Sequence, residues 1–324
     1  MEQRRVNWGI LGCGAIAQAA LAPAIRWSSN GTLLAVASRD VQTAASKARL
    51  VGALRAYGSY AALLEDPEVQ AVYVGLPNGL HEEWVVKAAQ AGKHVLCEKS
   101  LGLSHASAKA MAHAAKAKKV RLVEAFMYRH HPQWEVVRRL LADGAIGEVR
   151  GLRAGLTGRA PAADHRFTPL GGGALYDVTC YGVDVARYLF GAEPLGCVGR
   201  AAWVNPRTTP PVDTSSAAAL DFPGGRIATV SGSLLCTTEQ YLVVMGTLGR
   251  LEVERPFIPE WNPTRVWVDR DGHRTEHVVG GANQFLHQVE HFANLVLEPE
   301  RDAYPAEDGV GNARVLELVG RSAG

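Results

Sequence analysis

The sequence predicts an α/β fold: a doubly wound parallel sheet, followed by an α+β domain with an open, mainly antiparallel sheet. Three observations lead to this prediction. An apolar strand at 8–11 runs into the pattern G-x-G-x-x-A, strands and helices alternate as far as residue 124, and strand-like runs separated by turn residues dominate from residue 146 onward. A chain of 324 residues is also long enough for two hydrophobic cores. We expect one domain over 1–124 and a second over 125–324.

The first strand ends in a glycine pattern that suits a dinucleotide. Gly12 permits a tight turn, Gly14 leaves room for a pyrophosphate beside the backbone, and Ala17 lets the following helix approach the strand. The helix expected at 15–27 offers free N–H groups and the positive end of its dipole to phosphates. The alternative is an ordinary turn, because small residues mark those too. The residues expected to hold the dinucleotide here are Gly12, Gly14, Ala15 and Ile16.

The second strand, expected at 32–38, ends in Ser38 and Arg39. An acidic residue near this point is typical of NAD binding. A hydroxyl followed by a guanidinium suits a ribose 2′-phosphate instead, since arginine binds phosphate through two parallel hydrogen bonds. The alternative is that Arg39 is solvated and that Asp40 caps the next helix or takes the ribose hydroxyl. We expect NADP(H) to be preferred over NAD(H).

The rest of the first domain keeps the same alternation. Two more strand ends carry residues at the edge of the sheet where open α/β folds bind ligands. Pro77 and Asn78 follow one strand, and Glu98 and Lys99 follow another, although such a charged pair is also common on a plain surface. Expected helices lie at 40–52, 60–65, 79–91 and 104–118, and expected strands lie near 57 and at 71–75, 93–97 and 120–124.

The second domain reads as a sheet with helices on one face. Turn residues at 223–225 and 271–272 suit β-hairpins. Expected strands lie at 147–157, 195–204, 215–221, 226–235, 240–245, 250–254, 264–268 and 275–279. Expected helices lie at 132–142, 174–190, 284–297 and 306–319.

A run of three glycines at 171–173 lets the backbone approach a neighbour closely. The helix after it carries Asp177, Tyr181 and Asp184 at spacings of four and three, which predicts one shared face. That face also has apolar neighbours, and carboxylates on a partly buried face need partners. These carboxylates either belong to a site or form structural pairs.

Composition excludes several classes of function. The formal net charge is +2, so no strong positive field recruits nucleic acid. No apolar run is long enough for a membrane span or fits a signal peptide. Five scattered cysteines without a C-x-x-C pair indicate reduced thiols. We expect a cytoplasmic protein that binds neither nucleic acid nor membranes.

Four motifs together resemble the Gfo/Idh/MocA oxidoreductases, which include glucose–fructose oxidoreductase and inositol dehydrogenase. They are G-I-L-G-C-G-A-I-A at 9–17, E-K at 98–99, E-A-F-M-Y-R-H-H-P at 124–132 and G-G-G-x-L-x-D-x-x-x-Y-x-x-D at 171–184. The resemblance implies a Rossmann domain, a substrate domain and a homodimer or homotetramer formed through the open sheet. Tyrosine at 181, where many members have histidine, is similar to the branch with glucose–fructose oxidoreductase, NADP-dependent xylose dehydrogenase, dihydrodiol dehydrogenase and sugar-nucleotide ketoreductases.

The resemblance also implies roles for individual residues. Lys99 becomes the catalytic lysine, Asp177 the motif aspartate and Tyr181 the acid/base. Ser100 departs from the family pattern, which usually has a proline there to preset the turn that aims the lysine. Further cofactor contacts are expected from Ser38, Arg39, Pro77, Asn78, His81, Glu98, Lys99 and Arg166. Substrate contacts are expected from Tyr128, Arg129, His130 and Asp177.

A mechanism follows from the chemistry of these groups. Oxidation of a secondary alcohol or a sugar hemiacetal removes a proton while hydride passes to nicotinamide. A free tyrosine has a pKa of about 10, too high for a base at neutral pH, and a nearby ammonium favours the phenolate. Lys99 supplies that charge and a hydrogen bond to the developing alkoxide, and Asp177 orients the substrate hydroxyl or the lysine. In reverse, Tyr181 donates the proton to a carbonyl.

Other interpretations remain open at this stage. His287 and His291 form H-x-x-E-H, an inverted zinc-protease pattern, but apolar residues between and around them indicate a packing helix. The histidines at 130, 131 and 165 form another possible metal cluster, although a substrate contact suits one of them better. We expect no metal site.

Three further alternatives concern the loop and the function. Arg159 and Arg166 precede the glycine run, either in a lid over the site or in a plain surface loop. The chain is also compatible with an NDP-keto-sugar or diol reductase, or with a dinucleotide sensor without catalysis. The presence of both Lys99 and Tyr181 argues against a sensor, which needs neither.

Overall fold

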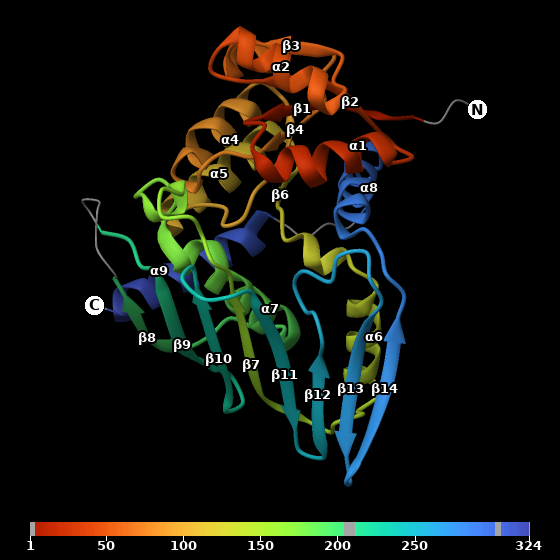
Figure 1. Cartoon of the computed structure of the whole chain (residues 1–324), viewed down its shortest axis with the longest axis vertical. Coiled ribbons are helices and arrows are strands. Elements are labelled where there is room, and N and C mark those ends of the chain that lie inside the picture. Colours follow the sequence, from red (N-terminus) through yellow and green to blue (C-terminus); the bar gives the residue numbers. More distant parts are fainter. Residues whose placement is uncertain (1–3, 204–210, 302–305, 324) are drawn as a thin grey trace. The chain divides into compact units, whose positions relative to one another are not determined.

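The computed structural model describes residues 4–203, 211–301 and 306–323. Contacts divide the chain into two compact units, drawn in Figure 1. The first comprises Met1–Phe126 with Phe285–Val310, and the second comprises Met127–Gln284 with Gly311–Gly324. The helix near residue 290 therefore returns to the first unit after the chain has built most of the second.

The first unit contains a six-stranded parallel sheet in the order β3-β2-β1-β4-β5-β6. The strand order reverses between β1 and β4, where folds of this type bind dinucleotides. The strands are β1 (Val6–Leu11), β2 (Gly31–Ala37), β3 (Arg55–Tyr57), β4 (Ala71–Val74), β5 (His94–Cys97) and β6 (Leu122–Glu124). The helices are α1 (Ala22–Trp27), α2 (Val41–Val51), α3 (Tyr60–Leu64), α4 (His81–Gln90), α5 (His105–Lys118) and α8 (Gln284–Leu297).

Local sequence explains these elements. Side chains of Asp40, Ser59 and Ser104 accept hydrogen bonds from backbone N–H groups at the starts of α2, α3 and α5. The central strands are buried on both faces, as in a parallel sheet covered by helices. On one face Trp8 packs against Phe292 of α8, with ring centroids 5.2 Å apart, inside a core that α1 and α2 also enter. The predicted helix at 15–27 forms, with Ala17–Leu21 wound as a π-helix before α1.

The second unit contains an eight-stranded sheet in the order β14-β13-β12-β11-β7-β10-β9-β8. Every neighbouring pair is antiparallel except β7 and β10, which are parallel. The strands are β7 (Val149–Thr157), β8 (Gly196–Ala202), β9 (Ser215–Phe222), β10 (Arg226–Ser233), β11 (Glu239–Gly246), β12 (Gly249–Val253), β13 (Thr264–Arg270) and β14 (His273–Val279). The helices are α6 (Gln133–Ala142), α7 (Cys180–Phe190) and α9 (Ala306–Ala323). The predicted strand at 195–204 corresponds to β8, and its last residue lies outside the described residues.

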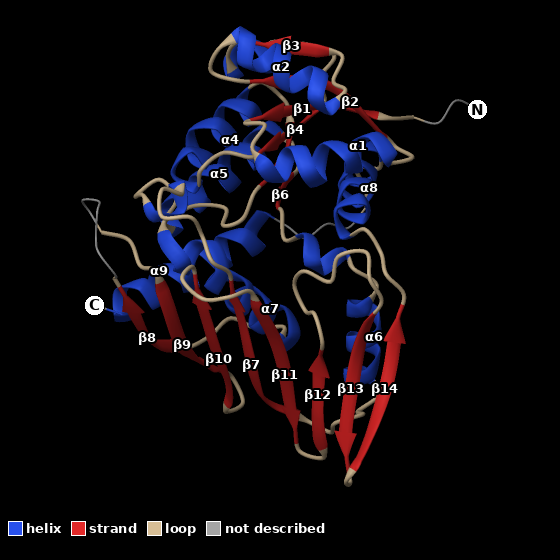
Figure 2. Ribbon diagram, viewed as in Figure 1, coloured by secondary structure: helices blue, strands red, loops and turns tan. Residues whose placement is uncertain are grey.

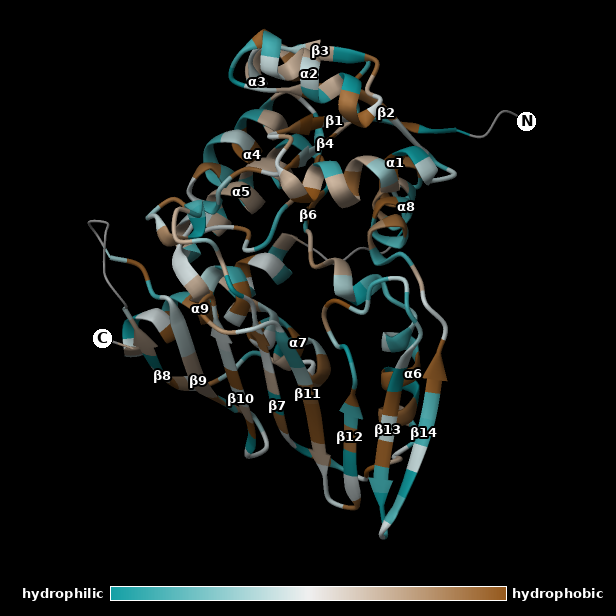
Figure 3. Cartoon of the chain, in the orientation of Figure 1, coloured by the Kyte–Doolittle hydropathy of each residue, from teal (hydrophilic) through white to brown (hydrophobic). Residues whose placement is uncertain are grey.

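Helices lie on one face of this second sheet, as Figure 2 shows. Helix α7 packs on β7 and β10, where a Cβ on Gly182 would lie 2.8 Å from the Cβ of Val230. Residues along β9 and β13 alternate between buried and more exposed, and Figure 3 shows bands of differing hydropathy along β13. Asp271 and Gly272 adopt positive φ in the β13–β14 hairpin, as predicted. The predicted fold class is confirmed.

Candidate active site

The glycine pattern of the first unit has the geometry that a pyrophosphate requires. Gly12 has φ of +80°, and a Cβ there would lie 2.4 Å from the side chain of Leu76. Gly14 faces open space, since a Cβ added to it would meet no atom within 4 Å. The helix begins directly after it, and Gln18 N–H donates to the Gly14 carbonyl at 3.0 Å. Gly12 is therefore needed for the turn, whereas Gly14 leaves the approach to the helix N-terminus unobstructed.

The contacts after β2 show which of its two predicted roles Asp40 has, the helix cap or the partner of the ribose hydroxyl. Its Oδ1 accepts a hydrogen bond from the backbone N–H of Thr43 at 2.7 Å, and this bond lowers the pKa of the Asp40 carboxyl. Asp40 thus caps α2. Arg39 is exposed, and within the described part of the chain no hydrogen bond or ion pair holds its guanidinium. The guanidinium is available to a phosphate.

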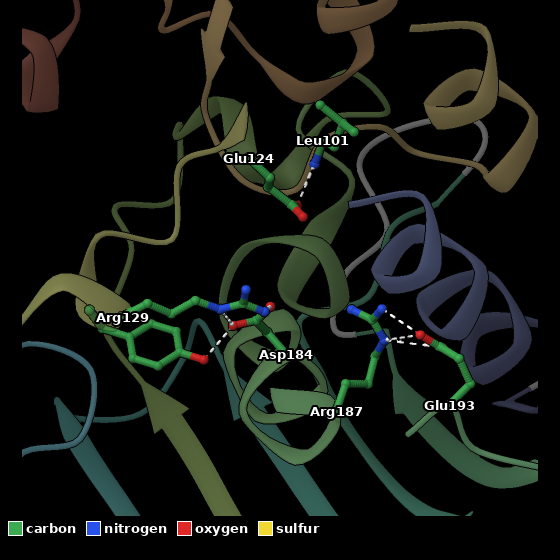
Figure 4. Close-up of polar contacts among 7 residues, drawn as sticks. Leu101, Glu124, Arg129, Asp184, Arg187 and Glu193 are labelled. Carbon is green, nitrogen blue, oxygen red and sulfur yellow. Dashed lines mark hydrogen bonds and ion pairs between the residues drawn. The ribbon is translucent and has the colours of Figure 1, made fainter. Parts of the chain in front are cut away.

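Lys99 follows β5 at the carboxyl edge of the first sheet, as predicted. The backbone around it is tied at several points. Glu98 Oε1 accepts from the Tyr73 hydroxyl at 2.6 Å, and Glu98 Oε2 accepts from the Lys99 N–H at 3.2 Å. Two residues further on, Leu101 N–H donates to Glu124 Oε1 at 2.7 Å (Figure 4). These hydrogen bonds hold the turn without proline on both sides of the lysine, and the peptide bond between Lys99 and Ser100 is cis.

His81 is fully buried and links two loops at this edge. Its Nε2 lies 2.8 Å from the Leu76 carbonyl oxygen, and its Nδ1 lies 3.1 Å from the Ser100 carbonyl oxygen. Burial lowers the pKa of His81, so the ring is neutral at physiological pH. The Asn78 side-chain amide donates to the same Ser100 oxygen at 3.4 Å. In this structure His81 and Asn78 brace the loop that carries Lys99.

In the second unit, the glycine run approaches the chain's own backbone. A Cβ on Gly171 would lie 2.3 Å from the His165 carbonyl oxygen, and one on Gly173 would lie 2.5 Å from the Asp213 carbonyl oxygen. Gly172 and Gly173 both have positive φ. The glycines therefore allow two segments to pack closely against them, the loop that precedes them and the segment that contains Asp213. The loop also brings Arg166 beside the next helix.

Asp177 and Asp184 have different partners, although their spacing predicts a common face. Arg166 donates through Nη1 to Asp177 Oδ2 at 3.1 Å and is itself held by two hydrogen bonds from its side chain to Asp164. Asp184 is buried against Tyr128 and Arg129. Asp184 therefore forms a structural pair, which is one of the two alternatives that the sequence left open. Asp177 lies in Leu175–Thr179, which is wound as a π-helix, and Asp184 lies on α7.

Tyr181 lies on α7 with 4% of its surface exposed. Its hydroxyl lies 3.5 Å from the Met127 sulfur, a weak acceptor. Its ring lies 5.3 Å from the ring of Phe257 and 6.0 Å from that of Tyr128. These ring contacts help to fix the orientation of the Tyr181 side chain.

Asp213, which sequence reasoning missed, anchors the start of this helix. Its Oδ2 accepts from Leu175 N–H at 2.9 Å, and its carbonyl oxygen accepts from Ala174 N–H at 3.0 Å. No local pattern marks it, since its partners are 38 and 39 residues away in the sequence. Burial raises the pKa of Asp213 to about 6.

The raised pKa of Asp213 predicts a pH-dependent stability. Between about pH 4, the unfolded pKa, and about pH 6, the folded chain binds more protons than the unfolded chain, so the free energy of unfolding falls as pH rises. We expect Asp213→Asn to remove this fall, making the variant relatively more stable at pH 7 than at pH 4 by up to about 3 kcal/mol. Urea unfolding from pH 4 to 7.5 measures it, with exposed Asp221→Asn as control. Parallel pH curves for wild type and Asp213→Asn would contradict this origin.

The zinc-like pattern has another use in the structure. Glu290 accepts hydrogen bonds from the Ser29 N–H and hydroxyl, both at 2.9 Å, and fastens α8 to the rest of the first unit. Among the residues that the structure describes, no group of three His, Cys, Asp or Glu side chains is arranged to hold a metal ion. In the same described part of the chain, no helix has the length and apolar character needed to cross a bilayer.

Comparison with known proteins agrees with this geometry. The model of the oxidoreductase family with an NAD-binding Rossmann fold matches residues 6–126, and that of the GFO/IDH/MocA C-terminal domain matches residues 134–252. The fold and the match together define an NAD(P)-binding oxidoreductase. The chain belongs to the Gfo/Idh/MocA family, which confirms the resemblance noted in the sequence.

Individual relatives align over almost the full length. D-xylose 1-dehydrogenase (NADP(+)) 2 of Haloferax volcanii is 35% identical, with 98% of this chain and 97% of that protein covered. A dTDP-3,4-didehydro-2,6-dideoxy-alpha-D-glucose 3-reductase of Actinomadura kijaniata is 32% identical, with 97% and 94% covered. The crystal structure of KijD10, a 3-ketoreductase from Actinomadura kijaniata in complex with NADP and TDP-benzene, superposes with a TM-score of 0.91 at 32% identity, covering 98% of both chains.

Proposed function

We propose that this protein is an NADP(H)-preferring dehydrogenase or reductase that moves a hydride between nicotinamide and a CH–OH group of a sugar or related hydroxy-carbonyl compound. One observation carries the proposal: this oxidoreductase fold has both groups that the proton transfer needs. Lys99 follows β5, and Tyr181 lies on α7. Relatives whose names include NADP and a sugar or a sugar nucleotide support the cofactor and the substrate class. The first unit would bind the dinucleotide and the second the substrate.

The proposed roles extend to the other site residues. Tyr181 transfers the proton, Lys99 favours its phenolate and hydrogen-bonds the developing alkoxide, and Asp177, paired with Arg166, orients the substrate. When bound, NADP accepts or supplies the hydride. Direct substrate contact from the segment at 128–130 is assigned to His130, because the Tyr128 and Arg129 side chains are engaged by Asp184. Cofactor contacts are assigned to Gly12, Gly14, Ala15, Ile16, Ser38, Arg39, Pro77, Asn78, Glu98, Lys99 and Arg166, with His81 bracing their loops.

A substrate panel tests the function. Absorbance at the reduced-nicotinamide band is followed with aldoses, inositols and diols plus NADP, and with keto-sugars and dTDP-keto-sugars plus NADPH. Turnover of an aldose supports a dehydrogenase, and turnover confined to a keto-sugar nucleotide supports the second candidate, a reductase like the Actinomadura relative. Binding of NADP by calorimetry without turnover of any compound would instead favour a dinucleotide sensor.

The cofactor preference gives a sharp prediction. Arg39→Ala removes a charge-assisted contact to the 2′-phosphate, and a loss of about 1.5–3 kcal/mol corresponds to roughly ten- to a hundredfold weaker NADP binding. NAD has no 2′-phosphate, so its affinity is expected to change little. Calorimetric titration of both cofactors measures the effect, with Arg49→Ala on the exposed side of α2 as a matched control. An equal loss for NADP and NAD would refute the assignment.

We also propose that copies of the chain associate through the open face of the second sheet. Its two halves differ. Over β8–β11 the face exposes Val198, Ile227 and Tyr241, whereas over β12–β14 it is covered by ion pairs such as Arg250–Asp269 at 2.8 Å. An exposed apolar patch of this kind suits a two-fold contact between identical surfaces.

Light scattering tests the association. We expect a dimer or tetramer at micromolar concentration and a shift toward monomer in Ile227→Glu, since a buried charge without a partner opposes the contact. Glu276→Gln, on the charged half, is expected to keep the wild-type mass. A wild-type monomer at all micromolar concentrations would overturn the proposal.

A further inference from the structure

A buried ion pair in the second unit is not used by the proposed proton transfer. Arg129 donates through Nε to Asp184 Oδ2 at 3.0 Å and through Nη2 to Oδ1, and the Tyr128 hydroxyl donates to the same carboxylate (Figure 4). The Asp184 side chain is 0% exposed and that of Arg129 is 5% exposed. Burying two charges is expensive, and a well-packed apolar group often stabilises a fold as well or better. The pair therefore points to a role besides stability.

The pair is mechanically linked to Tyr181. Asp184 follows Tyr181 by three residues on α7, so the two side chains are neighbours on the helix surface. Tyr128, bound to Asp184, places its ring 6.0 Å from that of Tyr181, and Phe257 contacts both rings at 5.4 and 5.3 Å. Burial, reinforced by the charge of Asp184, raises the pKa of Tyr128 well above its usual range, so Tyr128 remains a neutral donor.

The strands that pack against α7 bring uncharged side chains toward it. The strands β7 and β10 under α7 present Leu152, Ala154, Ala228 and Val230, none of which titrates. Met127 and Phe257 are uncharged. Two further charged groups of the second unit, Asp177 and Arg166, precede α7 and are paired with each other. Lys99 is added by the proposed function.

We propose that Arg129 and Asp184 are positioning residues for Tyr181: their mutual neutralisation keeps one helical turn beside the tyrosine free of net charge, and their fork-shaped contact fixes the segment that packs on its ring. The proposal rests on the proposed function, because it gives Tyr181 a proton to move. An unbalanced positive charge on Arg129 would lower the pKa of Tyr181, and an unbalanced negative charge on Asp184 would raise it.

The direct test is the titration of Tyr181 in the NADP-bound enzyme. Protein carrying ¹³Cζ-tyrosine shows its tyrosines individually by NMR, and the Tyr181 resonance is assigned by its disappearance in Tyr181→Phe. Asp184→Asn leaves Arg129 charged and unbalanced, and we expect the Tyr181 pKa to fall by about one unit, the size expected for one uncompensated charge a helical turn away. Arg129→Met/Asp184→Asn restores zero net charge and is expected to return the pKa to near the wild-type value.

Two further variants separate charge from shape. Arg129→Lys keeps the charge and loses the fork, so kcat is expected to fall while the Tyr181 pKa stays in place. Glu193→Gln is the matched control, because it deprives Arg187 of its carboxylate partner at the far end of the same helix (Figure 4). This control is expected to move the pKa of Tyr181 much less than Asp184→Asn does.

The outcomes are decisive in both directions. A Tyr181 pKa that is the same in wild type and Asp184→Asn, or that remains displaced in the double variant, overturns the proposal. If Asp184→Asn does not fold, Arg129→Met replaces it: its Tyr181 pKa is expected to lie above that of wild type, and an unchanged or lower value overturns the proposal. The resonance reports the pKa whether or not Tyr181 is catalytic, whereas wild-type turnover in Tyr181→Phe would reject only the proton-transfer role that the proposed function gives to Tyr181.

Discussion

Tyr181→Phe is expected to lower kcat by about 10²–10⁴, the usual contribution of a positioned acid or base, while folding and NADP binding persist. Only a hydroxyl is removed. The ring contacts with Tyr128 and Phe257 are retained by phenylalanine. The variant therefore isolates the proton-transfer group from the packing around it.

Steady-state rates with the best compound from the panel measure this effect, alongside an NADP titration. Tyr176→Phe is the matched control, since it removes a tyrosine hydroxyl just before α7 and is expected to keep kcat close to the wild-type value. If Tyr181→Phe retains near-wild-type turnover, the proton takes another route, and the histidines at 130, 131 and 165 become the next candidates.

Lys99→Ala is expected to lower kcat at least as far as Tyr181→Phe. The lysine is assigned two tasks, favouring the phenolate and stabilising the developing alkoxide, and alanine removes both. Lys99→Arg is not expected to rescue the rate, because a planar guanidinium differs in shape from a compact ammonium. Lys87→Ala, at an exposed lysine on α4, controls for loss of a surface charge.

The double variant tests whether the two residues act together. Groups that form one catalytic unit show non-additive losses, so Lys99→Ala/Tyr181→Phe is expected to fall by far less than the product of the single effects. Multiplicative losses would show that Lys99 and Tyr181 serve separate steps, and the tuning role would be abandoned.

Much of the fold was accessible from sequence because local interactions decide it. The alternation of buried strands with helices, the caps at Asp40, Ser59 and Ser104, and the hairpin turn at Asp271-Gly272 all depend on residues only a few positions apart. The glycine pattern likewise specified its own turn, since Gly12 requires a positive φ.

The partners of the polar side chains were less accessible. Spacing alone grouped Asp177 with Asp184, but Asp177 pairs with Arg166 and Asp184 pairs with Arg129. Arg166, expected at the cofactor, is bonded to Asp164 and Asp177, and Asp213 was not anticipated at all. Such pairs form across loops and strands whose meeting depends on the whole sheet.

The sequence by itself determined the class of protein, the position of the dinucleotide loop and the candidates Lys99 and Tyr181, because each follows from residue type and short-range spacing. Only the tertiary structure decided that the glycines at 171–173 pack against the chain's own backbone, and that Asp184 is neutralised by Arg129, 55 residues away. The physical reason is that a buried charge is stable only beside a partner, and in a folded chain that partner is supplied by packing between distant segments.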